Sequence, residues 1–347
     1  MSILSSKPTI TRKELEGVLD CLMQEELIKG DIIKILESRV SELTGVKYAL
    51  TANSLTSAYH LAFLSLGIGS PSDEVVMPSY FDLAPLSALR LAGGTPILVD
   101  VEEGTLAPTL EQIREKVTER TKAIVIGHTF GFHMNVEELR EYKIPVIEDI
   151  SHVIGSEINE APAGQIGTIT LASFSPAMMI TTGNGAIALT NNSRFYSSMR
   201  ELRGSNERDN VVSFDYGMTD FQGAMGISQI MKLTDFIRRR RDIARTYYEA
   251  LKMTPHRTPY AYSETFTYQS FPVLFDAPVD KVEKFWKKAG VDIRRPISTP
   301  LHGYLNLKNM DYPQSDRYAK KLYSLPIYPT LTKKEIEKIS KTLASFV

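Results

Sequence analysis

Apolar positions along the chain follow two different periods, and each period predicts a different kind of element. From residue 10 to about residue 44, apolar side chains recur every three or four positions among charged ones, which predicts an N-terminal helical arm. From Val46 onward, apolar residues gather into short runs: VKYAL, EVVMP, TPILVD, KAIVIGH, PVIEDI, ITLASFS and GAIALT. Helical or turn segments of crossover length separate these runs. Strands that alternate with helices predict an α/β protein with a mostly parallel, doubly wound sheet.

The pattern changes again towards the C-terminus. After a polar loop, GSNERDNVVSFDYG, one long amphipathic helix is expected from about Thr219 to Lys252. The run of four arginines from Arg238 to Arg241 lies in this helix and is expected to form a solvated face. Beyond it, TYQSFPVLF predicts a strand, and KVEKFWKKAG and KKEIEKISKTLASF predict helices. The chain therefore divides into an arm plus a large domain over residues 1–252 and a small α+β domain over residues 253–347.

Composition excludes several classes of protein. The 347 residues are 43% hydrophobic and 23% charged, which is typical of a globular protein. Forty basic and 41 acidic residues leave a net charge of -1, so no overall field recruits nucleic acid or an anionic membrane. The single cysteine, Cys21, excludes an intramolecular disulfide and is expected to pack in the interior. With no signal-like N-terminus and no apolar stretch of membrane-spanning length, we expect a cytoplasmic protein.

Polar residues at two strand ends suggest a ligand site, because ligands of doubly wound sheets lie beyond the carboxyl ends of the strands. Asp149 ends a buried apolar run, where a carboxylate needs a cation or a donor. The protonated pyridine nitrogen of pyridoxal phosphate would be such a partner, and capping of the next helix is the alternative. A second turn could bind a phosphate or, equally, could simply cap the helix that follows it. It contains Asn53, Ser54, Thr56 and Ser57. No residue spacing suggests a metal site.

These candidate sites lie within a series of seven sequence blocks. They are NSLTSAYHLAFLSLGIGSPSDEVVMPSY, AGGTPILVDVE, RTKAIVIGHTFG, PVIEDISHVIGS, SFSPAMMITTGNGAIALT, DYGMTDFQGAMGISQ, and RRPISTPLHGY with SLPIYPTLT. In this order they resemble the DegT/DnrJ/EryC1/StrS family, the fold-type I, pyridoxal phosphate-dependent aminotransferases of nucleotide-sugar biosynthesis. The resemblance runs over nearly the whole chain. It implies a fold-type I aminotransferase, with the cofactor in the large domain of residues 1–252.

Four positions match the family's cofactor residues. The resemblance implies that Asp149 pairs with the pyridine nitrogen and that His152 lies near the ring and its phenolic oxygen, where the family has Gln or His. Ser173 matches a serine whose hydroxyl binds the cofactor phosphate. Thr56 falls in the phosphate turn, beside Ser54.

Five positions depart from the family pattern. Met178 occupies the position of the lysine that forms the Schiff base and moves the proton during transamination. Asp82 stands where the family stacks an aromatic ring on the pyridine, and Leu55 replaces the glycine of the phosphate turn. Asp215 stands where many members use an asparagine from the neighbouring subunit to hold the phosphate, which a carboxylate would repel. GNGA at residues 183–186 replaces the usual GEGG.

Three explanations of Met178 are open at this level. It was introduced in place of lysine to trap a ligand, in an otherwise active enzyme. Alternatively it is natural and the protein uses pyridoxamine phosphate without a Schiff base, like the family's sugar dehydratases, with His152 as the general base. In the third explanation the site has lost transamination, and the fold binds a sugar nucleotide or a partner protein. The cofactor, pyridoxal or pyridoxamine phosphate, would then be held non-covalently or not at all.

The family activity is amino transfer from glutamate to a keto-sugar nucleotide, in nucleotide-sugar or surface-polysaccharide biosynthesis. We expect a homologue whose ordinary transamination is impaired or lost at Met178, so that enzymatic activity itself is left open. The resemblance also implies a homodimer and a place for His302 near the substrate mouth. His128 is expected to be structural and Trp286 to lie in the core.

Overall fold

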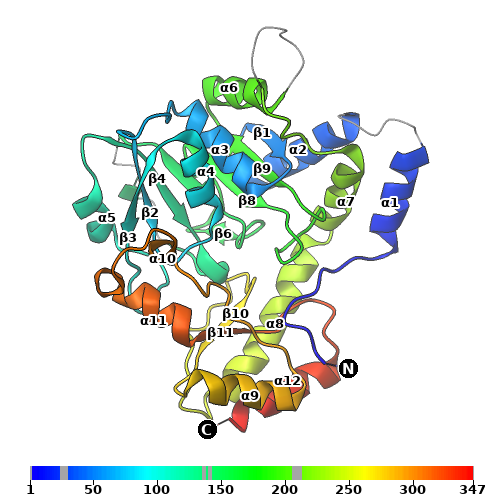
Figure 1. Cartoon of the computed structure of the whole chain (residues 1–347). Coiled ribbons are helices and arrows are strands. Elements are labelled where there is room, and N and C mark those ends of the chain that lie inside the picture. The colour runs from blue at the N-terminus through cyan, green and yellow to red at the C-terminus, as the bar shows by residue number, and fades with distance from the viewer. Residues whose placement is uncertain (1, 24–29, 135–137, 140–142, 205–212, 347) are drawn as a thin grey trace.

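The computed structural model describes residues 2–23, 30–134, 138–139, 143–204 and 213–346 (Figure 1). Its main sheet has seven strands in the order β1-β9-β8-β5-β4-β2-β3. They are β1 (Tyr48–Ala52), β2 (Glu74–Pro78), β3 (Thr95–Val99), β4 (Thr121–Gly127), β5 (Val146–Asp149), β8 (Ile169–Ser173) and β9 (Ala186–Thr190). Strands β3, β2, β4, β5 and β8 pair in parallel, whereas β9 pairs antiparallel with β8 and β1. The predicted mostly parallel sheet is confirmed.

Helices cover both faces of this sheet, which explains why the strands are apolar on nearly every residue. Alternate strand residues point to opposite faces: Val75 and Met77 pack in one core and Val76 in another. Helices α3 (Leu55–Ser65), α4 (Ala84–Ala92) and α6 (Ser193–Gly204) contribute to the first core. Helices α2 (Asp31–Thr44), α5 (Leu110–Lys116) and α7 (Asp220–Ile230) contribute to the cores on the opposite face.

The two long helical predictions are each divided in the structure. The N-terminal arm consists of α1 (Arg12–Met23) and α2. The single helix expected from Thr219 to Lys252 is wrong, because α7 ends at Ile230 and α8 (Leu233–Leu251) begins only after a turn. That turn is fixed by tertiary contacts: Gln229 and Lys232 both donate to the buried carboxylate of Glu14 on α1. Much of the predicted polar loop, residues 205–212, lies outside the described residues.

A smaller α+β layer follows α8. Strands β10 (Phe271–Leu274) and β11 (Leu322–Leu325) pair antiparallel. Trp286 is fully buried among them, as predicted. Near them lie α9 (Val279–Ala289), α11 (Pro313–Lys321) and α12 (Lys333–Ala344), below the main sheet in Figure 1. The short helix α10 (Leu301–Tyr304) instead lies against the main sheet, and its Leu301 packs in that core. Minor elements are the hairpin β6 (Glu157–Ile158) and β7 (Ala161–Pro162), and 3-10 turns at Thr129–Gly131 and Asn309–Asp311. The domain boundary at residue 252 stays a prediction.

The four arginines of α8 do not form the expected solvated face. Arg240 is buried, and its guanidinium donates to the carbonyls of Gln269, 3.1 Å away, and Ile327. Arg241 donates to the carbonyl of Phe266, and only Arg238, paired with Asp235, is fully on the surface. The cause is the loop backbone beside α8, whose carbonyls need donors once buried. Burial lowers the pKa of Arg240 to about 10.

Two further expectations can be compared with the structure. Cys21 is buried and unpaired, as predicted. Along the described part of the chain, no helix combines the length and apolar character needed to cross a membrane.

Candidate functional site

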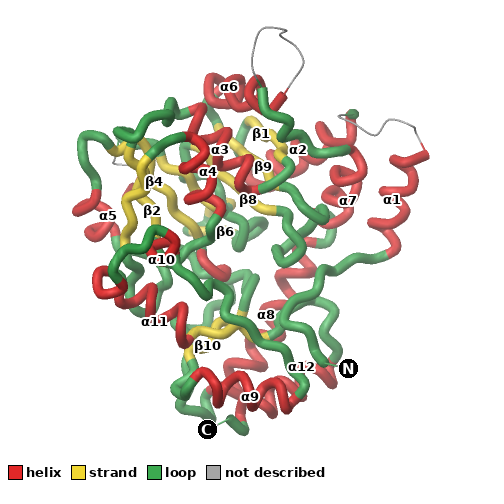
Figure 2. The backbone as a smooth tube through the Cα atoms, in the orientation of Figure 1, coloured by secondary structure: helices red, strands yellow, loops and turns green. Residues whose placement is uncertain are grey.

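A cavity of about 110 Å³ lies where the carboxyl ends of β4 and β5 meet the loops that follow β1, β2 and β8. Figure 2 shows the strands in yellow and the loops in green. Five residues singled out from the sequence line it: Leu55, Asp82, Asp149, His152 and Met178. Ser54, Thr56, Ser173, Asp215 and His302 are not among its lining residues. The structure therefore brings together half of the predicted set around one space. Their roles remain predictions.

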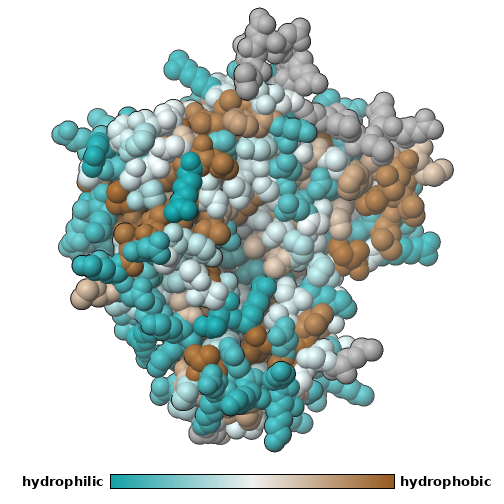
Figure 3. All heavy atoms as spheres, in the orientation of Figure 1, coloured by the Kyte–Doolittle hydropathy of each residue, from teal (hydrophilic) through white to brown (hydrophobic). Residues whose placement is uncertain are grey.

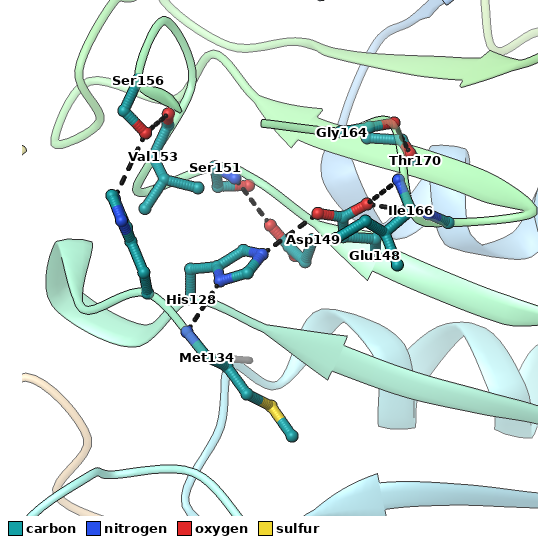
Figure 4. Close-up of polar contacts among 12 residues, drawn as sticks. His128, Met134, Glu148, Asp149, Ser151, Val153, Ser156, Gly164, Ile166 and Thr170 are labelled. Carbon is teal, nitrogen blue, oxygen red and sulfur yellow. Dashed lines mark hydrogen bonds and ion pairs between the residues drawn. The ribbon is translucent and has the colours of Figure 1, made fainter. Parts of the chain in front are cut away.

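Asp149 ends β5 on one wall of this cavity (Figure 4). Its Oδ2 accepts a hydrogen bond from the hydroxyl of Tyr59 on α3, at 2.8 Å. Its Oδ1 accepts from the backbone N–H of Ser151, at 2.9 Å. Burial raises the pKa of Asp149, the bonds from Ser151 and Tyr59 lower it in part, and the negative charge of Asp82 raises it further. The carboxylate is thus held by neutral donors and lacks a cation.

A second carboxylate, Glu148, faces the other side of β5 and is fully paired (Figure 4). Its Oε1 accepts from Nε2 of His128 at 3.1 Å, and its Oε2 accepts from the backbone N–H groups of Ile166 and Gly167. Burial alone would raise the pKa of Glu148, but these bonds outweigh it and the pKa is lowered. Nδ1 of His128 accepts from the N–H of Met134, so this imidazole is tied at both nitrogens. Such a pair fits the structural role expected for His128.

His152 is fixed in one tautomer. Its Nδ1 accepts a hydrogen bond from the backbone N–H of Phe130, at 3.0 Å. A neutral imidazole that accepts at Nδ1 carries its proton on Nε2. Burial, then the positive charge of Arg294, lowers the pKa of His152 to about 4. At neutral pH this ring is therefore an uncharged hydrogen-bond donor through Nε2.

Met178 lies half-buried in the turn after β8, with its side chain on the cavity wall. The turn is held by Met178 N–H donating to the carbonyl of Ser175, at 3.1 Å, and by Gln269 Nε2 donating to the carbonyl of Ala177, at 2.8 Å. One of these bonds lies within the turn and the other comes from Gln269 in the C-terminal layer. Together they hold residue 178 beside the cavity. The thioether carries no titratable proton.

The turn between β1 and α3 offers donors for an anion. Ser54 caps α3: its Oγ accepts from the N–H of Ser57, at 3.1 Å. The N–H groups of Leu55 and Thr56 have no hydrogen-bond partner among the described residues. They stand at the positive end of an 11-residue helix. The Leu55 side chain, however, lines the cavity itself and takes up some of its space.

Ser173 is buried below the cavity rather than on its surface. Its N–H donates to Oγ of Ser151, at 2.8 Å, and its own Oγ accepts from the N–H of Ser175, at 3.3 Å. The hydroxyl proton of Ser173 has no acceptor among the described residues, but the side chain does not line the cavity.

The carboxylate of Asp82 has a structural role at the start of α4. It is exposed, and its Oδ1 accepts from the N–H of Ala84, at 2.7 Å, at the start of α4. The neighbouring Phe81 also lines the cavity and packs on Gly127, where an added Cβ would stand 2.4 Å from the ring. An aromatic side chain is therefore present at this wall one position earlier than the family pattern suggests. Gly127 is needed for its close approach.

Asp215 and His302 lie away from the cavity. Asp215 is exposed, and its backbone carbonyl accepts from Nδ2 of Asn53 in the same chain, at 3.1 Å. His302 is buried: its Nδ1 shares a proton with Oγ of Ser79 at 2.8 Å, and its ring stacks on Tyr312 at 4.8 Å. Burial lowers the pKa of His302.

Sequence reasoning missed three contributors to the site. Tyr59 reaches Asp149 from α3, Gln269 holds the Met178 turn, and Arg294 brings a positive charge to the cavity. Arg294 stood inside a block already singled out, RRPISTPLHGY, but nothing in the block marked one arginine over the other. Across the described ranges, no group of three or more His, Cys, Asp or Glu side chains could hold a metal ion.

The chain is similar to known proteins over nearly its whole length. The profile of the DegT/DnrJ/EryC1/StrS aminotransferase family matches residues 8–344. GDP-perosamine synthase from Escherichia coli O157:H7 is 29% identical over 354 residues, which cover 98% of this chain and 97% of the relative. The enzyme of the same name from Caulobacter vibrioides is 28% identical, with 97% and 96% covered.

Two solved structures show the same fold. The aminotransferase TlmJ from Streptoalloteichus hindustanus superimposes with a TM-score of 0.93 at 25% identity, covering 99% of this chain and 98% of that one. The putative sugar aminotransferase Spr1654 from Streptococcus pneumoniae, in its PMP form, gives 0.92 at 23% identity, with 99% and 97% covered. The predicted fold-type I aminotransferase fold is confirmed.

Proposed function

Since this chain belongs to the DegT/DnrJ/EryC1/StrS aminotransferase family, we propose that it holds pyridoxal or pyridoxamine phosphate non-covalently and acts on a nucleotide-linked sugar. We further propose that ordinary transamination is impaired at Met178. The observation that carries the proposal is the methionine on the wall of a cavity that also contains Asp149. The sugar class is supported by the names of the two relatives, and the cofactor by a related structure in PLP and PMP forms.

The residues present fit the ring of the cofactor. Asp149 is buried, is supplied only with neutral donors and has a raised pKa. A cationic N–H placed against it would supply the missing counter-charge. When bound there, the cofactor would supply an electron sink for the substrate carbon that carries the amino group. Asp149 would hold the ring nitrogen protonated, and the Nε2–H of His152 would donate to an oxygen beside it.

The residues also fit the cofactor phosphate. The N–H groups of Leu55 and Thr56, which have no partner among the described residues, are two donors at the start of α3. Backbone donors at a helix N-terminus bind phosphate without any need for a glycine, provided that the side chain can turn aside. Leu55 is the residue that must do so.

Met178 leaves the site without the amine that the family uses. A thioether can neither form a bond to the cofactor carbon nor carry a proton to and from the substrate. His152 is a poor replacement as a base, because Nδ1 is occupied by the N–H of Phe130 and Nε2 already bears the proton. Its low basicity, with a pKa of about 4, points the same way. This reasoning disfavours the dehydratase-like alternative.

A second candidate is a non-catalytic subunit that binds a sugar nucleotide or a partner protein. The intrusion of the Leu55 side chain into the cavity favours it, since that side chain competes with a cofactor for space. An active enzyme that carries an introduced methionine in place of lysine is the third possibility, and it shares with the proposal the gain of amino transfer expected for Met178→Lys.

The deciding experiment is an absorbance titration with pyridoxal phosphate and, separately, with pyridoxamine phosphate. It compares the chain as it stands with Met178→Lys. We expect saturable binding of both compounds by the Met178 protein, without the visible band of a lysine-bound cofactor. Met178→Lys should gain that band and should also gain amino transfer by several orders of magnitude.

Other outcomes would contradict the proposal. No binding by either protein would favour the non-catalytic subunit. Efficient turnover by the Met178 protein would show that another group moves the proton.

A further inference from the structure

A pocket smaller than the cavity lies where the N-terminal segment meets α8 and the C-terminal layer. Its volume is about 10 Å³, which is enough for one water-sized occupant. No aspartate, glutamate or histidine is among the described residues that line it. Its polar side chains include those of Ser5, Ser6, Arg240, Ser270, Arg294 and Ser324.

Arg240 brings a positive charge to this pocket without a counter-charge. The residue is only 6% exposed. Its hydrogen bonds all come from Nη1, which donates to the carbonyls of Tyr268, Gln269 and Ile327. Its buried Nε has no hydrogen-bond partner, and no carboxylate among the described residues pairs with the guanidinium. A carbonyl satisfies a donor but does not neutralise a charge, so the charge of Arg240 is buried uncompensated.

The other polar groups of the pocket are donors as well. Arg294 makes no side-chain hydrogen bond or ion pair with the described residues. The hydroxyls of Ser270 and Ser324 share one proton, and the second proton has only a long bond, of 3.4 Å, to the carbonyl of Leu325. Two guanidinium groups that line one small pocket disfavour each other unless an anion lies near them both.

We propose that this pocket binds one small monovalent anion of the size of chloride, with Arg240 as its buried counter-ion. A space for one water-sized sphere can take a monatomic anion but is too small for phosphate or sulfate. The N–H and O–H donors around it would make charge-assisted hydrogen bonds to the anion. A water molecule is the alternative occupant. It would satisfy the same donors but would leave the charge of Arg240 uncompensated.

The anion would tie the N-terminal segment to α8. This segment already joins the C-terminal layer through Ile3, whose N–H donates to the carbonyl of Gly290 at 2.9 Å and whose carbonyl accepts from the N–H of Asp292 at 2.8 Å. Ser5 and Ser6 follow and reach the pocket. Only the folded chain brings these parts together, so a bound anion should stabilise the folded state in proportion to its occupancy.

Thermal unfolding of the full chain tests this, with gluconate replaced stepwise by chloride at constant ionic strength. Constant ionic strength keeps general screening unchanged. We expect the Tm to rise with chloride, to level off at saturation and to gain at least about 2 °C in all. Bromide should act like chloride. A crystal grown in bromide should show an anomalous-scattering peak in the pocket beside Arg240.

A charge placed on the pocket wall should replace the anion. Ser6→Asp supplies a tethered carboxylate, so it should raise the Tm in chloride-free buffer and should lose most of the response to chloride. Ser6→Asn is the matched control, since it has the same size without the charge, and it should not raise the Tm in that buffer. Arg240→Gln should also lose the response. Because it removes the bonds to the loop carbonyls as well, the two Ser6 variants carry the test.

Three results would overturn the inference. A Tm that does not respond to chloride at constant ionic strength, or a bromide crystal without a peak beside Arg240, would mean that the pocket holds only water. A chloride response that persists undiminished in Ser6→Asp would place the anion elsewhere on the protein. Equal Tm values for Ser6→Asp and Ser6→Asn in chloride-free buffer would show that the pocket contains no uncompensated charge.

Discussion

At the scale of single residues, the charge and the hydrogen bonds of the buried Asp149 carboxylate decide which ligand the cavity can hold. Asp149 accepts from the hydroxyl of Tyr59 and from the backbone N–H of Ser151, and a side-chain hydrogen bond from Ser151 also lowers its pKa. A hydrogen bond to an ionised, buried oxygen is stronger than one to a neutral carbonyl. Tyr59 thus sets the orientation of the group that we expect to meet the cofactor nitrogen.

Tyr59→Phe should lower the free energy of unfolding by about 1.5–3 kcal/mol, because it removes a bond to a charged group. Tyr247→Phe is the matched control, since the Tyr247 hydroxyl donates to the neutral carbonyl of Pro326 at the same distance of 2.8 Å. Tyr247→Phe should lower the free energy of unfolding by about 0.5–1.5 kcal/mol. Urea unfolding of the cofactor-free protein at pH 7 measures both. A larger loss in the Tyr247 variant would show that Asp149 is not ionised there.

His152 should make the protein sensitive to acid in a defined window. Its pKa is lowered from 6.5 to about 4 in the folded protein, chiefly by burial. The unfolded chain then binds a proton more readily, so the stability contributed by the neutral ring is complete above pH 6.5 and is lost as the pH falls towards 4. His152→Gln, which can still accept from the N–H of Phe130, should flatten the fall of unfolding free energy between pH 6.5 and 4. Equal slopes in the two proteins would refute the lowered pKa.

At the scale of elements, the junction of α1, α7 and α8 is held by one buried carboxylate. Glu14 accepts from Gln229 at 2.8 Å and from both the N–H and the hydroxyl of Thr11, and it pairs with Lys232. Burial would raise the pKa of Glu14, but these four contacts outweigh burial and lower it to about 2. The contacts sit at the turn that separates α7 from α8. They explain why the two helices do not continue as one.

Glu14→Gln should therefore destabilise the fold by about 1–3 kcal/mol at neutral pH, the cost of leaving buried partners unsatisfied. Because the pKa of Glu14 is depressed, its contribution is complete above pH 4.5 and is lost as the pH falls towards 2. The difference between the variant and the unaltered protein should accordingly shrink below pH 4.5. Glu16→Gln is the control: its pair with Arg12 is exposed and should contribute less than about 1 kcal/mol. Chemical unfolding at pH 7 and pH 3 tests both statements.

At the scale of the whole molecule, α1 exposes an apolar stripe that none of the described residues covers. Leu15 and Leu19 are each 59% exposed, Leu22 is 48% exposed and Met23 is 83% exposed. Figure 3 shows apolar surface at the side where α1 lies in Figure 1. Contiguous apolar surface of this kind marks an interface. We propose that a second copy of the chain covers it, in the homodimer that the family resemblance implies, and that Asp215 lies near the partner's site.

Light scattering on a sizing column should then report a dimer for the unaltered chain. The double variant Leu15→Glu with Leu19→Glu places two charges in the stripe and should shift the protein towards monomer without loss of helical signal. Lys13→Glu, a charge change at an exposed position of the same helix, is the control and should remain dimeric. A monomeric unaltered chain, or a double variant that stays a dimer, would contradict the proposed interface.

The strands could be read from the sequence because their signal is local. Each run such as EVVMP or ITLAS is buried on both faces of a parallel sheet, so most of its residues are apolar. The same applies to α9 and α12, whose amphipathic period survives any arrangement of their neighbours. The family blocks added the fold class and the order of the candidate residues, including the methionine at position 178.

What the sequence could not supply were the contacts between distant segments. The turn at residues 231–232, the burial of Arg240 and the tautomer of His152 each depend on a donor or acceptor that lies far away in the chain. So does the placing of Arg294 on the wall of the cavity. By itself the sequence determined the elements, the fold class and which residues could do chemistry. Only the tertiary structure decided which of these residues are free to do chemistry. Hydrogen bonds from remote segments, and burial by them, set the charge and the protonation state of each group.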